Sequence, residues 1–468
     1  MSAPRIAVIG GGWAGCAAAV ELADAGARVT LFEAARELGG RARRVELHGE
    51  VVDNGQHILI GAYSATLALM DRVGVPRAAL RRLPMRLDLP GRFSLALPRL
   101  PAPLHVVAGL ARAHGLTLAD KLGALRWMIG CRLGGFRAPA GMTVADWIAS
   151  APAAMRRYML EPLCVAALNT RPDEASAAVF ARVLRDSLGG ARAASDLLLP
   201  AVDLGALLPD ACAAFVRAHG GEVRLGQRLL RLESVMTGEG RARWRCDVGG
   251  AVNARLGVDD NASANNSELF DAVILATPPA ASAALLRDIA AGATSNPGAA
   301  TASNPAAALA ALDGFRYEPI ATVYFRAPGI TLPAPMIALD EVPDRAEFGQ
   351  FAFDRRQLGL PDGRIALVAS GARTLLDLDR TAVIAASARQ LARVLGIAVE
   401  RLDPASALLV IEKRATFRCT PGLARTPVQS GFAGLLLAGD HADPDYPATL
   451  EGAVRSGQRA ARAALATA

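Results

Sequence analysis

Short apolar segments next to glycine mark both ends of this chain. Residues 5–9 (Arg-Ile-Ala-Val-Ile) form a β-branched run of the kind found in buried parallel strands. Glycines follow at once, residues 17–25 then have the composition of a helix, and residues 28–33 form a second apolar run. This order predicts a strand–helix–strand unit at the N-terminus.

The C-terminal part repeats the pattern. Residues 434–440 are apolar until they end in Gly-Asp, which predicts a buried strand, and residues 449–453 begin a helix after a polar turn. Arg455, Arg459 and Arg462 recur along that helix, and we expect them to form a solvated face rather than a binding patch.

From residue 83 the chain departs from this arrangement. Residues 83–90 and 92–98 have the pattern of two short paired strands, and residues 100–136 are apolar and basic at helical spacing. The second stretch fits either a membrane-dipping amphipathic surface or helices of a second domain that pack together. Further helical patterns cover residues 144–148, 158–164 and 175–187.

Alternating strand and helix patterns return after residue 200. They predict a helix over 207–219, a strand over 221–225, a small antiparallel meander over 229–248 and a buried strand within 270–279 that ends at a Pro-Pro turn. We also predict strands over 320–325, 348–353 and 365–370, and a helix over 381–395.

A chain of 468 residues is too long for one hydrophobic core, so two domains are expected. We predict an α/β protein with a discontinuous first domain (residues 1–82, 200–310 and 406–468) and an inserted α+β domain (residues 83–199 and 311–405). Low-complexity stretches within residues 257–304 are polar or alanine-rich, and we expect them to be loops.

Composition narrows the functional classes. The net charge of +7 comes almost entirely from arginine spread along the chain, which argues against a nucleic-acid partner and leaves an anionic substrate or membrane surface open. The six cysteines and six histidines lack metal-ligand spacing, so we expect reduced, buried thiols and no metal. Apolar runs are too short to span a bilayer, and the N-terminal run stops at glycines as a signal peptide would not, so we expect a cytoplasmic protein.

The first glycines carry the most specific chemistry. Gly10, Gly12 and Gly15 have the spacing G-x-G-x-x-G, directly after a predicted strand and before a helix, with Ala14 inside the motif. Gly10 permits the tight turn, Gly12 lets a diphosphate approach the backbone, and Gly15 lets helix and strand pack closely. Glu33, at the end of the second strand, is placed to accept hydrogen bonds from ribose hydroxyls. We therefore predict a dinucleotide site rather than a glycine turn without a ligand.

A second glycine segment follows within a few residues. Gly39 and Gly40 offer backbone N–H groups and Arg41 a guanidinium, which together suit the two negative charges of the same diphosphate. Residues 51–57 then form a predicted strand that runs into a polar turn.

Together with the C-terminal Gly-Asp strand and the helix after it, these segments resemble the flavin amine oxidase and carotenoid desaturase superfamily. The resemblance implies a Rossmann-like FAD-binding domain of the glutathione-reductase-like, amine oxidase type, with an inserted α+β substrate domain and FAD between the two ends of the chain. It implies contacts with FAD from Gly10, Gly12, Ala14, Gly15, Glu33, Gly39, Gly40, Arg41, Gly55, Gln56, Leu229, Gly439, Asp440, Leu450 and Glu451.

The resemblance also implies what these residues contact. Arg41 and the first glycines belong at the diphosphate, and Glu33 at the adenosine ribose. The backbone of Leu229 meets the adenine, and Asp440 lies near the ribityl chain and the diphosphate. The backbone of residues 450–451 lies beside the flavin ring. Ala35 departs from the pattern, since relatives often have arginine there, so that contact is missing.

Longer segments are similar to one branch of this superfamily, the hydroxysqualene dehydroxylases. This resemblance is weakest over residues 250–310, and it implies that reduced FAD removes the hydroxyl group of hydroxysqualene, an apolar isoprenoid, to give squalene for hopanoid and related triterpene synthesis. We expect the apolar region 85–200 to form the wall of the substrate slot. The segments concerned are residues 53–57, 61–63, 161–170, 183–190 and 195–200.

The proposed chemistry needs a proton donor near the hydroxyl group. Our first candidate is His57, because its turn is expected to approach the flavin; the alternative is a histidine that only satisfies backbone groups near the cofactor. Asp445 and Tyr446, in the turn after the C-terminal Gly-Asp pair, are the second candidates, and a loop-capping aspartate is their alternative.

Three further polar residues lie in the branch-like segments. We expect Asp53 to brace its own turn. Asn169 and Asp196 either orient the hydroxyl group or only hold helices together.

Other functions fit parts of the same pattern. A carotenoid-type desaturase or an amine oxidase of this fold would use oxidised flavin and take hydride from the substrate. Aromatic residues for an amine cage are scarce, at 5% of the chain. A prenyl-protein escort factor of related fold would bind without flavin catalysis, and the intact glycine motifs argue against it.

The number of nucleotide-binding motifs and the solubility of the implied substrate bear on the electron donor and on the location of the protein in the cell. The chain has one nucleotide fingerprint, so no separate NAD(P)H domain is expected, and the reducing equivalents come from an unidentified partner or from a donor that binds transiently. An insoluble substrate predicts loose association with the inner membrane or with the upstream synthase.

Overall fold

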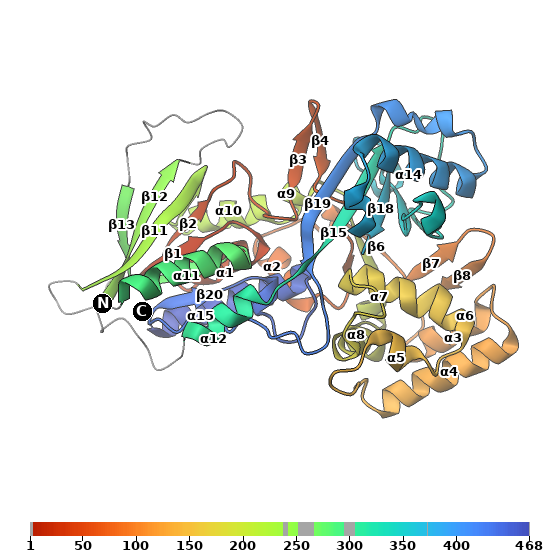
Figure 1. The fold of residues 1–468 in the computed structure, drawn as a ribbon, viewed down its shortest axis with the longest axis horizontal. Coiled ribbons are helices and arrows are strands. Elements are labelled where there is room, and N and C mark those ends of the chain that lie inside the picture. Colours follow the sequence, from red (N-terminus) through yellow and green to blue (C-terminus); the bar gives the residue numbers. More distant parts are fainter. Residues whose placement is uncertain (1–2, 237–241, 251–265, 294–304, 372, 468) are drawn as a thin grey trace.

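The computed structural model describes residues 3–236, 242–250, 266–293, 305–371 and 373–467. A five-stranded sheet lies in the part of the molecule that contains both ends of the chain (Figure 1). Its strand order is β10-β2-β1-β14-β20, and every pairing is parallel. The strands are β1 (Arg5–Ile9), β2 (Arg28–Glu33), β10 (Glu222–Leu225), β14 (Ala272–Leu275) and β20 (Leu435–Leu437).

Strand β1 is buried on both faces, which explains why it is a continuous apolar run rather than an alternating one. Ile6 and Val8 join a core with helices α1 (Trp13–Asp24), α10 (Pro209–Ala218) and α15 (Leu450–Thr467). Ala7 and Ile9 face the other way, toward a second layer. That layer consists of β11 (Gln227–Met236), β12 (Ala242–Gly250), β13 (Asn266–Phe270), α11 (Pro279–Ala293) and α12 (Pro305–Asp313).

A second five-stranded sheet is antiparallel, with the order β16-β17-β18-β15-β19. Its side chains alternate, so Val323 and Phe325 pack beneath helix α14 (Arg380–Leu395), whereas Tyr324 faces the opposite core. The strands are β15 (Tyr317–Phe325), β16 (Met336–Ala338), β17 (Phe351–Asp354), β18 (Ile365–Ser370) and β19 (Leu408–Phe417), and α13 (Arg355–Leu358) follows β17.

A group of short helices packs into that opposite core, at the lower right of Figure 1. Two of its segments are π-helical, Arg156–Leu160 and Arg185–Gly189, an uncommon geometry that often accompanies functional sites. The regular elements are the hairpin β7 (Arg86–Leu89) and β8 (Phe93–Ala96), and helices α3 (Leu104–Arg112), α4 (Leu118–Leu133), α5 (Val144–Ile148), α6 (Ala153–Met155), α7 (Glu161–Leu168) and α8 (Ala177–Leu184).

Smaller elements connect these parts. Strand β9 (Leu197–Pro200) pairs with β5 (Leu59–Ile60) and β6 (Leu80–Leu83), so the chain leaves this small sheet before the helical group and returns to it afterwards. The remaining elements are the hairpin β3 (Arg44–Leu47) and β4 (Glu50–Asp53), and helices α2 (Ser64–Arg72) and α9 (Leu204–Leu207). The domain bounds stay a prediction, and β19, which follows the predicted boundary at residue 406, pairs in the antiparallel sheet.

Several elements differ from the sequence-based expectation. Helix α1 begins at Trp13 rather than at residue 17, because Gly12 of the glycine motif is its N-cap. The predicted helix 207–219 corresponds to α10 and begins two residues later than expected, because Pro209 starts a new helix after α9 ends at Leu207. The predicted Pro-Pro turn instead begins α11 at Pro279. Much of the predicted loop region 257–304 lies outside the described residues.

The expectation of a solvated arginine face on α15 is wrong for two of its three residues. Half-buried Arg455 donates to Glu451 at 2.7 Å, and half-buried Arg459 lies 3.0 Å from Asp443. Exposed Arg462 pairs with Glu21 of α1 at 3.1 Å. The pairs of Arg459 and Arg462 hold the C-terminal helix against the preceding turn and the first helix, whereas the pair of Arg455 lies within α15.

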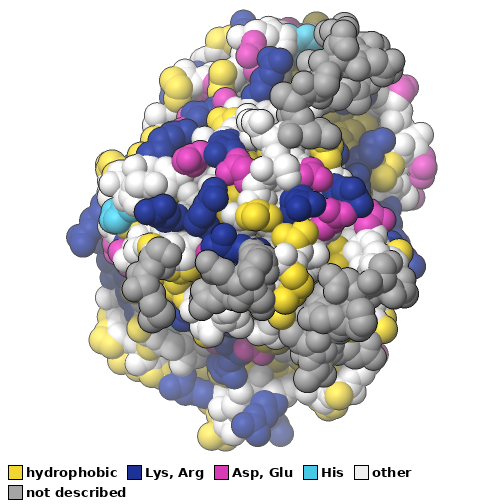
Figure 2. Space-filling model, turned by 90° about the vertical axis from the view of Figure 1, so that its left-hand side faces the viewer, with side chains coloured by type: hydrophobic (Ala, Val, Ile, Leu, Met, Phe, Trp, Pro, Cys, Tyr) yellow, Lys and Arg dark blue, Asp and Glu magenta, His cyan; other side chains and the backbone are white. Residues whose placement is uncertain are grey.

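The surface and the thiols agree with the composition. Figure 2 shows the end of the molecule that bears sheet β11–β13, where basic and acidic side chains alternate over short distances. All six cysteines are free and five are buried, as expected. Among the described residues, no single helix has the length and apolar character to cross a bilayer. The helices Arg380–Leu395 and Val399–Ser406, which are bent against each other, reach that length and apolar character only when they are counted as one span.

The contact between α15 and α1 generates a stability prediction. A Cβ atom at Gly457 would lie 2.0 Å from the carbonyl oxygen of Ala14, so Gly457→Ala must push the two helices apart. We expect a loss of about 1–3 kcal/mol in the free energy of unfolding, measured by urea denaturation, together with reduced cofactor content. Gly130→Ala is the control, because that exposed helical position has open space and should gain up to about 1 kcal/mol. Equal unfolding midpoints for the two variants would contradict this packing.

Candidate functional site

The two glycine segments predicted from the sequence lie against each other. Gly10 has φ +104°, and a Cβ atom there would lie 2.6 Å from the carbonyl oxygen of Ala276, so only glycine fits this turn after β1. The N–H of Gly39 donates to the carbonyl oxygen of Gly11 at 2.8 Å. A Cβ atom at Gly40 would lie 3.1 Å from Cα of Gly12. The structure thus brings together the two segments that the sequence assigned to one diphosphate.

The start of α1 completes this cradle. Within the described residues, no side chain caps the helix and no acidic residue lies in its first turn, which contains Ala14 and Gly15. Helix N-termini present N–H groups and a partial positive charge to anions. At Gly12, the nearest atom to an added Cβ is 3.8 Å away, so backbone rather than side chain borders this space. The cradle therefore fits the diphosphate of a dinucleotide.

Glu33 lies beside the same turn. Its carboxylate accepts hydrogen bonds from the N–H of Gly11 at 2.6 Å and of Ala35 at 2.7 Å. A carboxylate has four lone-pair positions, so two remain for hydroxyl groups. Leu229 lies in β11, within the core cluster that also contains Phe32 of β2. The contact of Glu33 with the ribose and that of Leu229 with the adenine stay predictions.

Arg41 and Asp440 come from opposite ends of the chain and form an ion pair of 2.6 Å. Burial alone would raise the pKa of Asp440. The guanidinium of Arg41 outweighs the effect of burial and holds the pKa of Asp440 below the usual value of an aspartate. Arg41 also donates to the carbonyl oxygen of Ala415 at 2.8 Å, and 40% of its side chain stays exposed. Donors of Arg41 are therefore left over for a phosphate, beside the second glycine segment.

His441 was not among the residues predicted from the sequence. It is buried after Gly439 and Asp440, and its Nδ1 lies 3.1 Å from Oγ1 of Thr426. Burial lowers the pKa of His441 to about 4, against the favourable charge of Asp440 and together with the repulsion from Arg41. The sequence shows a histidine next to Asp440, but nothing in it signals burial.

Residues from distant segments of the chain hold the polar turn after β4 in place. Asp53 accepts from the N–H of Leu204 at 2.8 Å and pairs with Arg355 at 3.1 Å. Arg355 also donates to Oε1 of Gln56 at 2.9 Å. Asp53 thus braces its turn through two distant segments rather than within the turn. The predicted cofactor contacts of Gly55 and Gln56 stay predictions.

His57 lies in that turn with its Nδ1 2.8 Å from the carbonyl oxygen of Gly55. Because a carbonyl only accepts, Nδ1 carries the hydrogen. Burial lowers the pKa of His57, and nearby Arg41 lowers it further, against the hydrogen bond to Gly55 and the charge of Asp53. At neutral pH the ring is therefore mainly neutral and satisfies the backbone, as the alternative interpretation held. Only its protonated fraction could donate a proton from Nε2.

Asp445 and Tyr446, the second candidates for the proton donor, lie in different surroundings. Asp445 is exposed and pairs with Arg182 at 3.2 Å. Tyr446 is buried, and its hydroxyl donates to Asp186 at 2.7 Å. Burial and that carboxylate raise the pKa of Tyr446 to about 12, so it keeps its proton and commits it to Asp186.

The loop cap expected at Asp445 is instead Asp443. Its Oδ1 accepts from the N–H of Asp445 at 2.9 Å and of Tyr446 at 3.0 Å. Two aspartates in one turn both fit the capping pattern, and only the backbone conformation decides between them.

Glu451, fully buried at the start of α15, anchors that helix to α2. Its carboxylate accepts from the N–H groups of Ala65 at 3.0 Å and Thr66 at 2.9 Å, and from the Thr66 hydroxyl at 2.8 Å. The side chain therefore serves as the cap of α2. The predicted placement of the Leu450–Glu451 backbone beside the flavin ring stays a prediction.

Asn169 and Asp196 hold segments together. The amide of Asn169 accepts from the N–H of Gly371 at 2.6 Å and donates to Thr416 at 2.9 Å. Buried Asp196 pairs with Arg192 of its own segment at 2.8 Å and with Arg82 of β6 at 3.1 Å. Of the two expected roles, these contacts favour the structural one.

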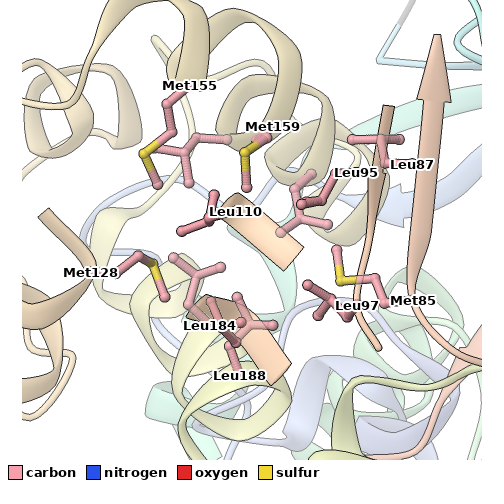
Figure 3. A pocket seen from close by; sticks show the side chains of 13 residues that line it. Met85, Leu87, Leu95, Leu97, Leu110, Met128, Met155, Met159, Leu184 and Leu188 are labelled. Atoms are coloured by element: carbon pink, nitrogen blue, oxygen red, sulfur yellow. The ribbon is translucent and has the colours of Figure 1, made fainter. Parts of the chain in front are cut away.

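An entirely apolar pocket lies in the helical group (Figure 3). Its cavity of about 30 Å³ is lined only by aliphatic and methionine side chains, and the four methionines make this wall adaptable. The π-helical segments contribute to the wall. The lining residues are Met85, Leu87, Leu95, Leu97, Val106, Leu110, Met128, Met155, Met159, Leu160, Leu163, Leu184 and Leu188.

The chain is similar to known flavoproteins over almost its whole length. Residues 13–465 match the family of flavin-containing amine oxidoreductases. The chain is 32% identical to the hydroxysqualene dehydroxylase of Rhodopseudomonas palustris and 28% identical to that of Sinorhizobium fredii, each over 98% of both chains. The structure of cyclohexylamine oxidase from Brevibacterium oxydans superposes with a TM-score of 0.61 at 19% identity, over 99% of both chains. The predicted fold class is confirmed.

The buried imidazole of His441 should make stability depend on pH. Its pKa is about 4 in the folded chain and about 6.5 when unfolded, so between these values the unfolded state binds more protons. Stability is therefore lost as pH falls, by about 2 kcal/mol between pH 7.5 and pH 5 from this group alone. Urea denaturation at both pH values should show that His441→Asn removes this part of the loss. Exposed His114→Asn is the control, and the same loss in both variants would exclude His441 as its source.

Proposed function

The chain belongs to the family of flavin-containing amine oxidoreductases, and we propose that within it the protein is a hydroxysqualene dehydroxylase, which converts hydroxysqualene to squalene. The family makes it an FAD-dependent oxidoreductase, as predicted. The narrower proposal is carried by its similarity, from end to end, to relatives with that name. The aliphatic lining of the pocket agrees with it, because a long isoprenoid offers almost only aliphatic surface, and the cavity of about 30 Å³ must widen to admit one.

The proposed reaction replaces a C–O bond by a C–H bond. The carbinol carbon gains a hydride, the hydroxyl group leaves with one added proton as water, and the two electrons come from the cofactor. Reduced FAD supplies these electrons as a hydride when it is bound. Because the carbinol is allylic, the positive charge that develops as the hydroxyl leaves is spread over three carbon atoms.

The protein's own residues then have three tasks. The glycine cradle, Arg41 and Glu33 hold the cofactor beside the parallel sheet. The apolar pocket orients the substrate chain and excludes water. For the third task, proton donation, we keep His57 as the proposed acid, in its protonated form. Its lowered pKa makes that form scarce at neutral pH and a strong acid when present.

Competing functions predict a different pocket lining or a different change in the redox state of the flavin. An amine oxidase needs aromatic side chains around its amine, and the described pocket lining contains none. A polyene desaturase would suit the same apolar pocket but would reduce the flavin instead of oxidising it. We further propose that the squalene serves hopanoid and related triterpene synthesis. Reducing equivalents come from a partner or a transiently bound donor.

A single turnover tests the proposed reaction. The purified protein is reduced without oxygen and mixed with hydroxysqualene, and flavin absorbance and squalene are followed together by spectroscopy and mass spectrometry. We expect one squalene for each flavin that is reoxidised. Bleaching of oxidised flavin by a polyene or an amine, without squalene from the reduced protein, would replace this proposal by a desaturase or an oxidase.

The pH dependence of that turnover tests His57. If its imidazolium is the acid, the rate rises as pH falls from 8 to 6, because the protonated fraction grows. His57→Gln should lower the rate by about 10²–10⁴-fold and abolish this rise, while bound flavin stays at the wild-type level. Turnover and pH profile unchanged in His57→Gln would show that His57 only satisfies its backbone neighbour.

A further inference from the structure

Helix α4 exposes a stripe of large apolar side chains. Leu118, Leu122, Ile129 and Leu133 are 49–84% exposed. Their spacing of four, seven and four residues places them on one face, within an arc of about 60° at 100° per residue. We call these four residues the α4 stripe.

The neighbouring helix α3 extends this surface. Leu104 and Val107 are exposed on it, and Leu100 is exposed just before it. Seven of the twelve exposed large apolar side chains among the described residues lie between residues 100 and 133. Single exposed leucines are ordinary, whereas such a concentration on two adjacent helices marks an interaction surface.

The charged residues of the segment that bears the stripe are mostly basic. Residues 99–137 contain six basic residues and one acidic residue, Asp120, which the capping box at Thr117 occupies. Elsewhere the arginines of this protein pair widely with carboxylates, but within the described residues none of these six forms an ion pair. On α4, exposed Arg126 and Arg132 flank the stripe. The basic residues are Arg99, Arg112, Lys121, Arg126, Arg132 and Arg137.

The same two helices line the apolar pocket with their other faces. Leu110 of α3 and Met128 of α4 belong to its wall (Figure 3), as does Val106 of α3. The pocket and the exposed apolar surface are therefore separated only by these helices. The cavity in this structure is far smaller than a triterpenoid chain, so the wall must shift when substrate enters.

We propose that the exposed faces of α3 and α4 dock on an anionic lipid bilayer, from which the substrate reaches the pocket. Apolar side chains flanked by basic ones are the pattern of a helix that lies in a membrane interface. The unpaired arginines complement anionic headgroups. The identity of the substrate rests on the proposed function, whereas the docking does not.

Vesicle sedimentation tests the docking. The FAD-loaded protein is mixed with vesicles of phosphatidylcholine and phosphatidylglycerol in equal parts, or of phosphatidylcholine alone, at low and high salt. We expect binding to the anionic vesicles that weakens with salt. The variant L118S/L122S/I129S/L133S and the variant R126E/R132E should each bind at least tenfold more weakly. The control L376S/M236S, which alters exposed apolar residues elsewhere, should bind like the wild type.

Two further measurements separate docking from folding and from catalysis. Bound flavin and turnover of detergent-dispersed hydroxysqualene should stay unchanged in the stripe variant, while turnover of vesicle-embedded substrate falls at least tenfold. Wild-type protein that ignores anionic vesicles, equal binding by the stripe variant, or a stripe-dependent dimer in gel filtration would overturn the proposal. If the wild-type protein forms no squalene from either the vesicle-embedded or the detergent-dispersed substrate, the proposed function is refuted. Vesicle sedimentation then still decides whether the protein docks on the bilayer.

Discussion

The parallel direction of the central sheet is the constraint on which the site depends. Strands that run the same way end at the same edge. The Gly10 turn, Glu33 and the Gly439–Asp440 segment follow three such strands and so share one edge, although they lie at opposite ends of the sequence. The ion pair between Arg41 and Asp440 spans this edge. An antiparallel arrangement of the same strands would have scattered these groups over two edges.

The molecule separates polar and apolar tasks in space. The sheet edge collects backbone donors and charged side chains, whereas the pocket wall has no polar side chain. A substrate with one hydroxyl on a long hydrocarbon matches that division, because its chain and its reacting group need opposite surroundings. Under the proposed function, the group that donates the proton to the hydroxyl is therefore expected outside the pocket wall, and His57 is our candidate.

How far the sequence predicts this structure depends on the range of the interaction. Residues 5–33 were predictable because strand, turn and helix signals lie within one short stretch. The start of α1 was placed too late, since the glycines were assigned to the turn although Gly12 already caps the helix. The burial of His441, the bracing of Asp53 by Arg355 and the cap at Asp443 depend on segments or backbone angles that meet only after folding. The π-helical distortions have no local signal at all.

The tight contact of Gly457 with Ala14 has a consequence for the time at which the protein becomes functional. During synthesis the N-terminal residues emerge first and already carry the glycine motif, but the face of α1 that α15 covers stays open. Strand β20, Asp440 and α15 leave the ribosome hundreds of residues later. The groups that we assign to the cofactor therefore come together only after residues 435–467 have been synthesised, and we expect flavin loading to follow that step. Until then, the uncovered helix is a surface for chaperones to shield.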